Sequence, residues 1–317
     1  MKAAMVVEAG RAPIYGDLEE PVPAPGRSVI RVTAASISHV TRGRAAGAHY
    51  SADRTLPFVP GIDGVGVTSD GRRVYFIMPD APFGAMAERT IAENRRTIAL
   101  PDDLADDTAA AMAIPGMSSW AALVERARLR VGETVLVNGA TGSSGRLAIQ
   151  IAKHLGAKRV IATGRRAQSF DDLRRLGADV IVPLTQDAEA LERALEKQFR
   201  QRIDIVLDYL WGSSAQAIII AAAKAGPEGV PIRFVQIGSI SGADVVLPGA
   251  VLRSSALELK GSGIGSVPLP NMLQAIQRVL LTASSAGFEI ATRSLPLEDV
   301  TRAWAADDSN ARIVLRP

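Results

Sequence analysis

Residues 134–145 read TVLVNGATGSSG, and this stretch decides the fold. The apolar, β-branched run at 134–138 predicts a buried strand, and an amphipathic pattern over 144–155 predicts the helix behind it. Glycine between them permits a tight turn and a close approach of the backbone to a pyrophosphate, which the first amides of the helix attract. The stretch therefore predicts a phosphate-binding turn made of Gly139, Thr141, Gly142, Ser143, Ser144 and Gly145. Its spacing departs from the usual G-x-G-x-x-G, so an ordinary turn is the alternative.

The next predicted strand ends in Gly164, Arg165 and Arg166. In a dinucleotide fold a carboxylate at this place binds the ribose hydroxyls, whereas arginine accommodates a 2′-phosphate. The first acids, Asp171 and Asp172, fall inside the following predicted helix. Because a guanidinium matches a phosphate in geometry and charge, we expect residues 164–166 to select NADPH over NADH. The alternative is a solvated basic loop.

Strands and helices alternate on both sides of these motifs. The predicted strands are 134–139, 160–163, 180–183, 203–208, 233–238 and 257–261, with helices at 144–155, 169–176, 188–199 and 214–225. This alternation is typical of a parallel sheet, and six strands in two halves predict a doubly wound dinucleotide-binding sheet of the α/β class. The fifth strand ends at Ile237 and Gly238, at the edge where ligands of such sheets bind, so we expect their backbone to hold the carboxamide of a nicotinamide.

The chain up to about residue 100 has a different pattern. Short apolar stretches at 3–7, 29–34, 64–68, 73–77 and 97–100 are broken by turn residues, which predicts a β-rich domain. A junction is expected where the composition changes, near residues 101–103. After the alternating region come two helical stretches, 271–281 and 297–306, and a last predicted strand, 312–315.

Composition narrows the function further. The 317 residues are 47% hydrophobic, enough for two domains, and the net charge of +3 is too small to indicate a nucleic-acid partner. The absence of cysteine removes thiol nucleophiles, disulfides and cysteine-ligated zinc, and three histidines leave little for a metal site. The longest apolar run, at 217–223, is far below the roughly 20 residues that span a bilayer. We expect a soluble, cytoplasmic protein without a membrane partner.

The whole chain resembles the medium-chain dehydrogenase/reductase superfamily, and within it the zinc-independent, quinone-oxidoreductase-like branch. Besides the glycine turn, the resemblance rests on residues 60–66 (PGIDGVG), 115–123 (PGMSSWAAL) and 235–238 (VQIG). It implies a substrate domain, GroES-like in that family, made of residues 1–118 and 264–317, with a Rossmann cofactor domain at 119–263 between them. It also implies a homodimer, formed by pairing the edge strands of two cofactor domains.

The resemblance bears on the chemistry as well. Zinc-using relatives carry an early cysteine and a Gly-His-Glu stretch, and the corresponding places here read Ser-Ile-Ser-His at 36–39 and Gly-Ile-Asp at 61–63. No metal-ligand set remains, so we expect no metal. The resemblance then implies hydride delivery from NADPH to an activated small-molecule acceptor, a quinone or the C=C bond of an α,β-unsaturated carbonyl.

The acceptor end departs from the family. Quinone-oxidoreductase-like relatives usually place an asparagine where this chain has Ser38 and an aspartate where it has Thr41. Some enoyl-thioester reductases of the superfamily use a tyrosine just after a glycine as proton donor, and here the segment after Gly47 is one residue longer, so either His49 or Tyr50 fits that place. A phenol or an imidazole can hydrogen-bond an enolate oxygen and supply a proton. We expect Tyr50, His49 and Ser38 near the acceptor, with Tyr50 slightly favoured as donor; surface loop side chains are the alternative.

Two other functions stay open at this point. An enoyl-thioester reductase needs a basic entrance for a phosphorylated carrier, which Arg42, Arg44 and Arg54 can supply or which can equally be surface charge. A protein that keeps the fold and senses NADPH without turnover is the other alternative, because fold does not dictate chemistry.

Overall fold

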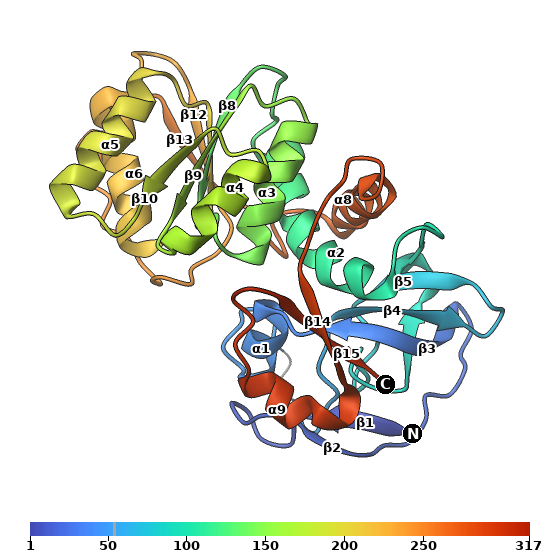
Figure 1. Cartoon of the computed structure of the whole chain (residues 1–317). Helices are drawn as coiled ribbons and strands as arrows, with labels where there is room; N and C mark the ends of the chain where they lie inside the picture. Colours follow the sequence, from blue (N-terminus) through green and yellow to red (C-terminus); the bar gives the residue numbers. More distant parts are fainter. Residues whose placement is uncertain (53–54) are drawn as a thin grey trace. The chain divides into compact units, whose positions relative to one another are not determined.

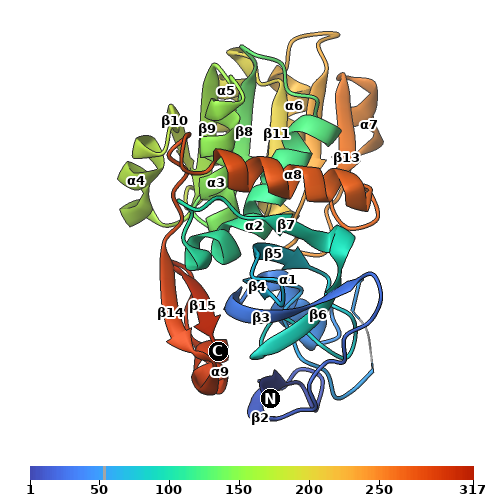
Figure 2. The ribbon, with the colours of Figure 1, turned by 90° about the vertical axis from the view of Figure 1, so that its right-hand side faces the viewer.

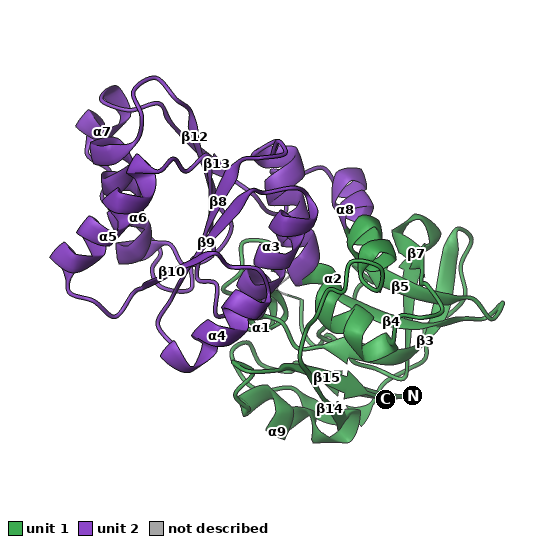
Figure 3. Cartoon of the chain, turned by 45° about the horizontal axis from the view of Figure 1, so that its top comes forward, with its two compact units in different colours: residues 1–114, 276–317 green, residues 115–275 purple. Residues whose placement is uncertain are grey.

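The computed structural model describes residues 1–52 and 55–317, which divide into two compact units. Unit 1 consists of Met1–Ile114 and Ile276–Pro317, and unit 2 of Pro115–Ala275 (Figure 3). The sequence predicts divisions at 118/119 and 263/264, whereas the units divide at 114/115 and 275/276. Both divisions fall inside helices, α2 (Asp106–Ala121) and α8 (Leu269–Thr282), so no linker marks them in the sequence.

Helix α2 begins shortly after residues 101–103, where the composition changes, and the division between the two units falls inside it. The helix continues through Pro115, a residue type that ordinarily breaks helices, and a short π-helical segment, Ala122–Arg126, follows it. The alanine-rich stretch before the proline has a high helix propensity. On its other side the hydroxyls of Ser118 and Ser119 donate to the Pro115 carbonyl at 2.8 and 2.9 Å.

Unit 2, all of whose residues are described, is built on a six-stranded parallel sheet in the order β10-β9-β8-β11-β12-β13 (Figures 1 and 2). Its strands are β8 (Thr134–Asn138), β9 (Arg159–Gly164), β10 (Val180–Pro183), β11 (Ile205–Asp208), β12 (Ile232–Gln236) and β13 (Leu257–Gly261). All six predicted strands are confirmed. The order reverses between β9 and β11, on either side of the central, fully buried β8, and ligands of doubly wound sheets bind at this point.

Helices cover the sheet of unit 2. They are α3 (Ser143–His154), α4 (Phe170–Arg175), α5 (Ala188–Arg200), α6 (Gly212–Ala225) and α7 (Gly249–Arg253). Helix α3 packs on β8 and β9. Helices α5, α6 and α7 share one apolar cluster with the sheet, in which Phe199, Ile218 and Val251 pack with Phe234 of β12. The helices thus bury the apolar faces of the sheet.

Unit 1 is β-rich, as the sequence predicts. Its described strands are β1 (Lys2–Met5), β2 (Ile14–Asp17), β3 (Arg27–Ser36), β4 (Asp63–Thr68), β5 (Arg73–Ile77), β6 (Arg89–Glu93), β7 (Thr97–Ala99), β14 (Thr292–Pro296) and β15 (Arg312–Arg316). Strands β1 and β2 form a hairpin-like antiparallel pair, and the main sheet has the order β14-β15-β3-β4-β5-β7, with β6 also paired to β3. Strand β15 pairs antiparallel with β3, so the predicted last strand returns to the first sheet.

Short helices complete unit 1. Helix α1 (His39–Ala45) follows β3 directly, and α9 (Val300–Ala305) precedes the turn into β15. The sequence analysis did not predict α1 or strands β2, β6 and β14, which are short and have mixed polar and apolar residues. No helix in residues 1–52 or 55–317 combines the length and apolar content needed to cross a bilayer.

Candidate functional site

In the glycine turn of unit 2, packing within the protein requires glycine at two positions and leaves a third position unconstrained. A Cβ at Gly139, where φ is +90°, would lie 2.8 Å from Leu210 Cγ, and a Cβ at Gly145 would lie 2.4 Å from the Gly139 carbonyl oxygen. At Gly142 the nearest atom would be 3.8 Å away. Packing within the protein therefore explains Gly139 and Gly145, whereas Gly142 leaves the backbone open to a ligand.

Helix α3 begins at this turn and presents its amides without a side-chain cap. Gly142 is the N-cap and carries no side chain to accept a hydrogen bond, and the first turn contains no acid. The first amides of a helix have no intrahelical acceptor, and the helix dipole favours an anion there. Thr141, Ser143 and Ser144 are half-exposed around this start. The six predicted turn residues thus lie around a helix start with free amides and no acid, which suits a pyrophosphate.

A buried hydrogen-bond network fixes the turn to three strands. Thr163 of β9 donates its hydroxyl to Asn138 Oδ1 at 2.6 Å and accepts the Gly139 amide at 3.1 Å. The Asn138 amide nitrogen donates to Asp208 Oδ1 at 2.7 Å and to the Ser214 hydroxyl at 3.0 Å. Burial raises the pKa of Asp208, and the hydrogen bond from Asn138 opposes this rise. Sequence reasoning missed this network, although a polar residue near the end of each predicted strand was a signal for it.

The two predicted arginines diverge. Arg166 is half-buried and its Nη2 donates to the carbonyl of Thr141, in the glycine turn, at 2.8 Å. Arg165 is exposed and donates to the Ser241 hydroxyl, after β12, at 2.7 Å. A Cβ at Gly164 would lie 2.5 Å from Thr141 Cγ2, so glycine lets the end of β9 approach the turn. Gly164 and Arg166 therefore adjoin the glycine turn at Thr141, whereas Arg165 contacts Ser241.

The predicted carboxamide contacts lie at the end of β12. The amides of Ile237 and Gly238 both donate to the Asp208 carbonyl, at 2.8 and 3.1 Å, and the Gly238 carbonyl accepts from Gln236 Nε2 at 3.0 Å. The fold already uses both amides. A carboxamide at this edge would therefore meet backbone carbonyls, which can accept its N–H groups.

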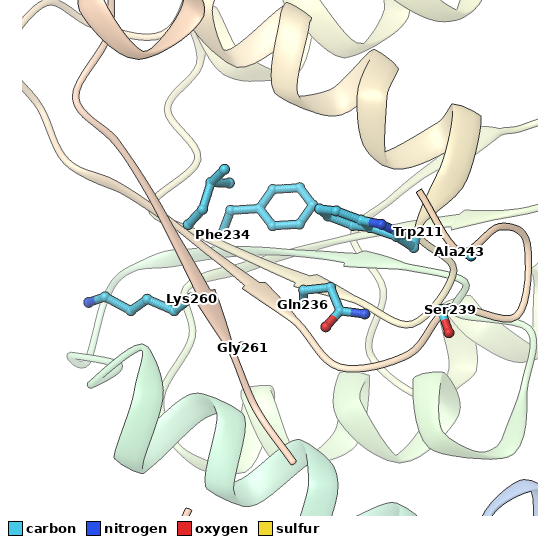
Figure 4. A pocket seen from close by; sticks show the side chains of 8 residues that line it. Trp211, Phe234, Gln236, Ser239, Ala243, Lys260 and Gly261 are labelled. Carbon is cyan, nitrogen blue, oxygen red and sulfur yellow. The ribbon is translucent and has the colours of Figure 1, made fainter. Parts of the chain in front are cut away.

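A pocket of about 410 Å³ lies at the ends of β12 and β13 (Figure 4). Its lining residues are Trp211, Phe234, Gln236, Ser239, Ala243, Leu259, Lys260 and Gly261. Trp211 and Phe234 form its aromatic side, with ring centroids 6.2 Å apart in an edge-to-face arrangement. The Trp211 backbone has a φ of +58°, rare for a bulky residue, and its amide donates to the buried Asp208 carboxylate at 3.1 Å.

In unit 1, Ser38 is occupied by its own helix. Its side chain is buried, with 3% exposure, and its hydroxyl accepts the Thr41 amide at 3.1 Å as the N-cap of α1. The hydroxyls of Ser38 and Thr41 are 2.9 Å apart. Capping by a serine stabilises a helix end by about 1 kcal/mol, which gives Ser38 a structural role that the sequence did not suggest.

His49 and Tyr50 lie together on the loop after α1. Their rings stack with centroids 4.3 Å apart, and Tyr50 is 71% exposed. The Nδ1 atom of His49 accepts the Ser51 amide at 3.2 Å and lies 2.8 Å from the Ser51 hydroxyl. Burial, and then the positive charge of Arg44, lowers the pKa of His49. A neutral imidazole is a weaker proton donor near pH 7.

Unit 1 also contains an apolar pocket of about 380 Å³. Its lining residues are Thr41, Arg44, Thr55, Phe58, Val59, Pro60, Gly61, Ile62, Met78, Pro79, Ala81, Pro82 and Phe83. Two aromatic rings, several prolines and a methionine dominate it, together with the hydroxyls of two threonines and one guanidinium. Thr41 connects this pocket to Ser38, whereas His49 and Tyr50 are not among its lining residues. Of the three predicted catalytic residues, the structure thus joins His49 to Tyr50 and leaves Ser38 apart.

Residues 61–63, which correspond to the Gly-His-Glu stretch of zinc-using relatives, are not suited to bind zinc. Ile62 offers no ligand atom, and the neighbouring Asp63 is fully buried, which raises its pKa to about 7. Within the described residues, no group of three or more His, Asp or Glu side chains is arranged to hold a metal ion.

Comparison with known proteins agrees with this architecture. A family model described as zinc-binding dehydrogenase matches residues 145–279. The chain is 31% identical, over 100% of both chains, to the probable NADPH-dependent quinone reductase tdiC of Emericella nidulans. It is 32% identical to the 2-methylene-furan-3-one reductase of Solanum lycopersicum, over 50% of this chain and 45% of that one. The quinone oxidoreductase of Thermus thermophilus, also solved as a complex with NADPH, superposes with a TM-score of 0.84 at 26% identity over 100% of both chains.

The chain therefore belongs to the medium-chain dehydrogenase/reductase superfamily, in its quinone-oxidoreductase-like branch. The predicted family is confirmed, and so is the predicted fold class, a doubly wound parallel sheet with a β-rich, GroES-like domain.

Proposed function

We propose that this protein is an NADPH-dependent oxidoreductase that reduces a quinone or the C=C bond of an α,β-unsaturated carbonyl. The observation that carries the proposal is the glycine turn with Arg166 held against it. Gly142 leaves the backbone open beside the uncapped start of α3, and the Arg166 guanidinium lies 2.8 Å from the Thr141 carbonyl. The start of α3 beside Gly142 fits a pyrophosphate, and the guanidinium of Arg166 fits a phosphate at the ribose 2′ position. The relative from Emericella nidulans, which matches over the whole of both chains, is named a probable NADPH-dependent quinone reductase.

The residues present fit this cofactor without further change. The amides at the start of α3 would bind the pyrophosphate, Gly164 and Arg166 would hold the ribose phosphate, and the carbonyls after β12 would accept hydrogen bonds from the carboxamide. When bound, NADPH supplies the hydride. The acceptor gains that hydride and one proton, so a quinone becomes a hydroquinone and an enone becomes a saturated carbonyl.

We propose a zinc-independent reaction because of the residues that stand in this chain. It has no cysteine, and an isoleucine occupies the place of the histidine ligand in zinc-using relatives. An acceptor that is already activated by conjugation, as quinones and enones are, can accept a hydride without a Lewis acid. The apolar pocket of unit 1, with Phe58, Phe83 and Met78 in its lining, suits a flat conjugated ring.

For the proton, we propose Tyr50 rather than His49. The phenol is exposed and reachable, whereas the lowered pKa of His49 keeps its imidazole neutral at pH 7. We place Ser38 in a supporting role, as the cap that positions Thr41 beside the apolar pocket.

The contacts of two arginines make an enoyl-thioester substrate less favourable. Arg42 pairs with Asp308 at 2.9 Å, and Arg44 donates to the Ser51 hydroxyl at 2.9 Å, so both guanidiniums already have partners within unit 1. Arg54 lies outside the described residues. A phosphorylated carrier would have to compete with these contacts.

Calorimetric titration with NADPH and NADH at fixed salt tests the cofactor. We expect Arg166→Ala to lower the affinity for NADPH much more than the affinity for NADH. Arg174→Ala is the matched control, because Arg174 is exposed and paired locally, with Asp171 at 2.7 Å. An equal loss for both nucleotides would refute the role of Arg166. Absence of binding by the unmodified protein would refute the proposed function.

Turnover assays then identify the acceptor. A quinone, a free enone and a pantetheine-linked enoyl substrate are offered with NADPH, and its oxidation is followed by the loss of absorbance of the reduced nicotinamide. A rate with the enoyl thioester that exceeds the others would replace the proposed substrate class. Binding of NADPH without turnover on any acceptor would favour the sensing alternative.

A further inference from the structure

A third arginine lies on the glycine turn, and the sequence analysis did not single it out. Arg146 follows the turn directly, in the first turn of α3, and its side chain is 23% exposed. Its Nε donates to the Thr141 carbonyl at 3.4 Å, the same oxygen that accepts from Arg166. Two guanidiniums therefore converge on one carbonyl from two different elements, α3 and the end of β9.

The negative charge at this place is small. Arg146 pairs through Nη1 with Asp172, the same carboxylate that Arg175 binds at 2.7 Å. Burial, and then the charges of Arg166 and Arg175, lowers the pKa of Arg146, although a guanidinium stays protonated at any physiological pH. Arg146 and Arg175 thus share one carboxylate, and Arg166 lies close enough to Arg146 for its charge to act on it. Three guanidiniums against one carboxylate leave a positive excess next to the glycine turn, where Gly142 leaves the backbone open.

A dianion would neutralise that excess. The end of β9 is where a dinucleotide fold places the ribose 2′ position, and a phosphate there carries the charge the cluster lacks. The exposed Arg165 does not join the cluster, because it is held by Ser241 after β12.

We propose that Arg146 and Arg166 together bind the 2′-phosphate of NADPH, and that Arg165 is dispensable for it. This inference rests on the proposed function and deepens it. The preference for NADPH over NADH is assigned to Arg146 of α3 and Arg166 after β9, in place of the adjacent arginines 165 and 166. Asp172 positions the Arg146 side chain.

The test uses adenosine 2′,5′-bisphosphate and 5′-AMP as probes, because they differ by the 2′-phosphate and need no turnover. Calorimetry compares the unmodified protein with Arg146→Gln, Arg166→Gln and Arg165→Gln. Arg146→Gln and Arg166→Gln each remove a charge-assisted hydrogen bond and should lower the affinity for the bisphosphate about 10- to 100-fold. The affinity for 5′-AMP should change by less than about twofold in the same variants, which also shows that the fold is intact.

The outcomes separate the inference from the proposed function. If the unmodified protein binds neither probe nor NADPH, the proposed function fails. If it binds them and Arg146→Gln keeps the full preference for the bisphosphate, only the inference fails. A loss in Arg165→Gln equal to that in Arg146→Gln would also overturn it, since Arg165 donates to Ser241 and not to the Thr141 carbonyl on which the other two arginines converge. Arg174→Gln, in the same helix as Asp172 but paired with Asp171, should match the unmodified protein.

Discussion

Asp63 of β4 makes the stability of unit 1 depend on pH. The residue is fully buried, its Oδ2 accepts the Tyr75 hydroxyl at 3.1 Å, and its Oδ1 has no hydrogen-bond partner among the described residues. Burial raises the pKa of Asp63 to about 7, opposed by the hydrogen bond from Tyr75 and by the charge of Arg312. The perturbation is Asp63→Asn, which keeps an acceptor for Tyr75 and cannot ionise.

The magnitude follows from the shift in pKa. An unfolded aspartic acid titrates near 3.8, so between that pH and about 7 the native protein holds a proton that the unfolded chain has released. Stability contributed by this proton is complete below the unfolded pKa and is lost as the pH rises to the folded pKa. At about 1.4 kcal/mol for each pH unit, the whole effect is about 4 kcal/mol, and about 2 kcal/mol of it falls between about pH 5.5 and 8.

The assay must report on unit 1 alone. Trp304 lies in unit 1, whereas Trp120 and Trp211 lie in unit 2, so a background with both of the latter changed to phenylalanine leaves one reporter. Urea unfolding is followed by tryptophan fluorescence at about pH 5.5 and pH 8, with and without Asp63→Asn. Between the two pH values, we expect the free energy of unfolding to fall by about 2 kcal/mol more in the parent than in the variant.

Asp70→Asn is the control for a change of charge alone. Asp70 is exposed, and hydrogen bonds from Thr68 and Arg72 lower its pKa, so it stays ionised throughout the range tested. The control should therefore keep the slope of the parent. If Asp63→Asn and the parent show the same slope, Asp63 is ionised in the native protein and Arg312, not burial, controls it; the reasoning would then be wrong.

Three further predictions concern the site and the assembly. Gly145→Ala should prevent the native fold of unit 2, because its Cβ would lie 2.4 Å from a carbonyl oxygen. Gly142→Ala should keep the melting temperature of the unmodified protein and weaken NADPH binding. Equal melting temperatures of the two variants would contradict this. Tyr50→Phe should slow enone reduction by about 100-fold or more while His49→Ala slows it less, measured by steady-state kinetics, and full turnover in both would assign the proton to water. We also propose a homodimer formed through the edge strand β13, where Leu259 is 37% exposed, so light scattering should give twice the chain mass of 33.4 kDa, and a monomer mass would refute it.

Much of the fold can be predicted from this sequence because unit 2 follows simple rules. Buried parallel strands give continuous apolar runs, and helices of several turns give clear periodicity, so β8 to β13 are found at nearly their observed bounds. Helix α2 is harder, since Pro115 is ordinarily a helix breaker and the seryl hydroxyls that bond to its carbonyl are local details. The edge strand β14 carries mixed residues, and only its parallel pairing with β15 defines it.

The site is predictable where backbone conformation determines it and not where side chains meet. Gly139 and Gly145 follow from steric need and appear in the sequence as spacing. Arg146 occupies one position of an amphipathic helix, where a charged residue normally indicates a solvated face, and only the folded chain shows it bent back over Thr141. In the same way, nothing local distinguishes Ser38 as a helix cap, because α1 itself was not predicted.

The pairing of β15 with β3 has a consequence for biosynthesis. Arg312 and Ile37, joined by a hydrogen bond, are 275 residues apart, so at a translation rate of about 5–20 residues per second the end of β3 waits roughly 15–55 s for its partner. Unit 2 emerges from the ribosome whole during that interval and can fold first. The nascent chain meanwhile carries an open strand edge, which is prone to aggregation and suited to chaperones. Expression conditions that slow elongation should therefore lower the yield of native protein more than the stability of the finished chain would suggest.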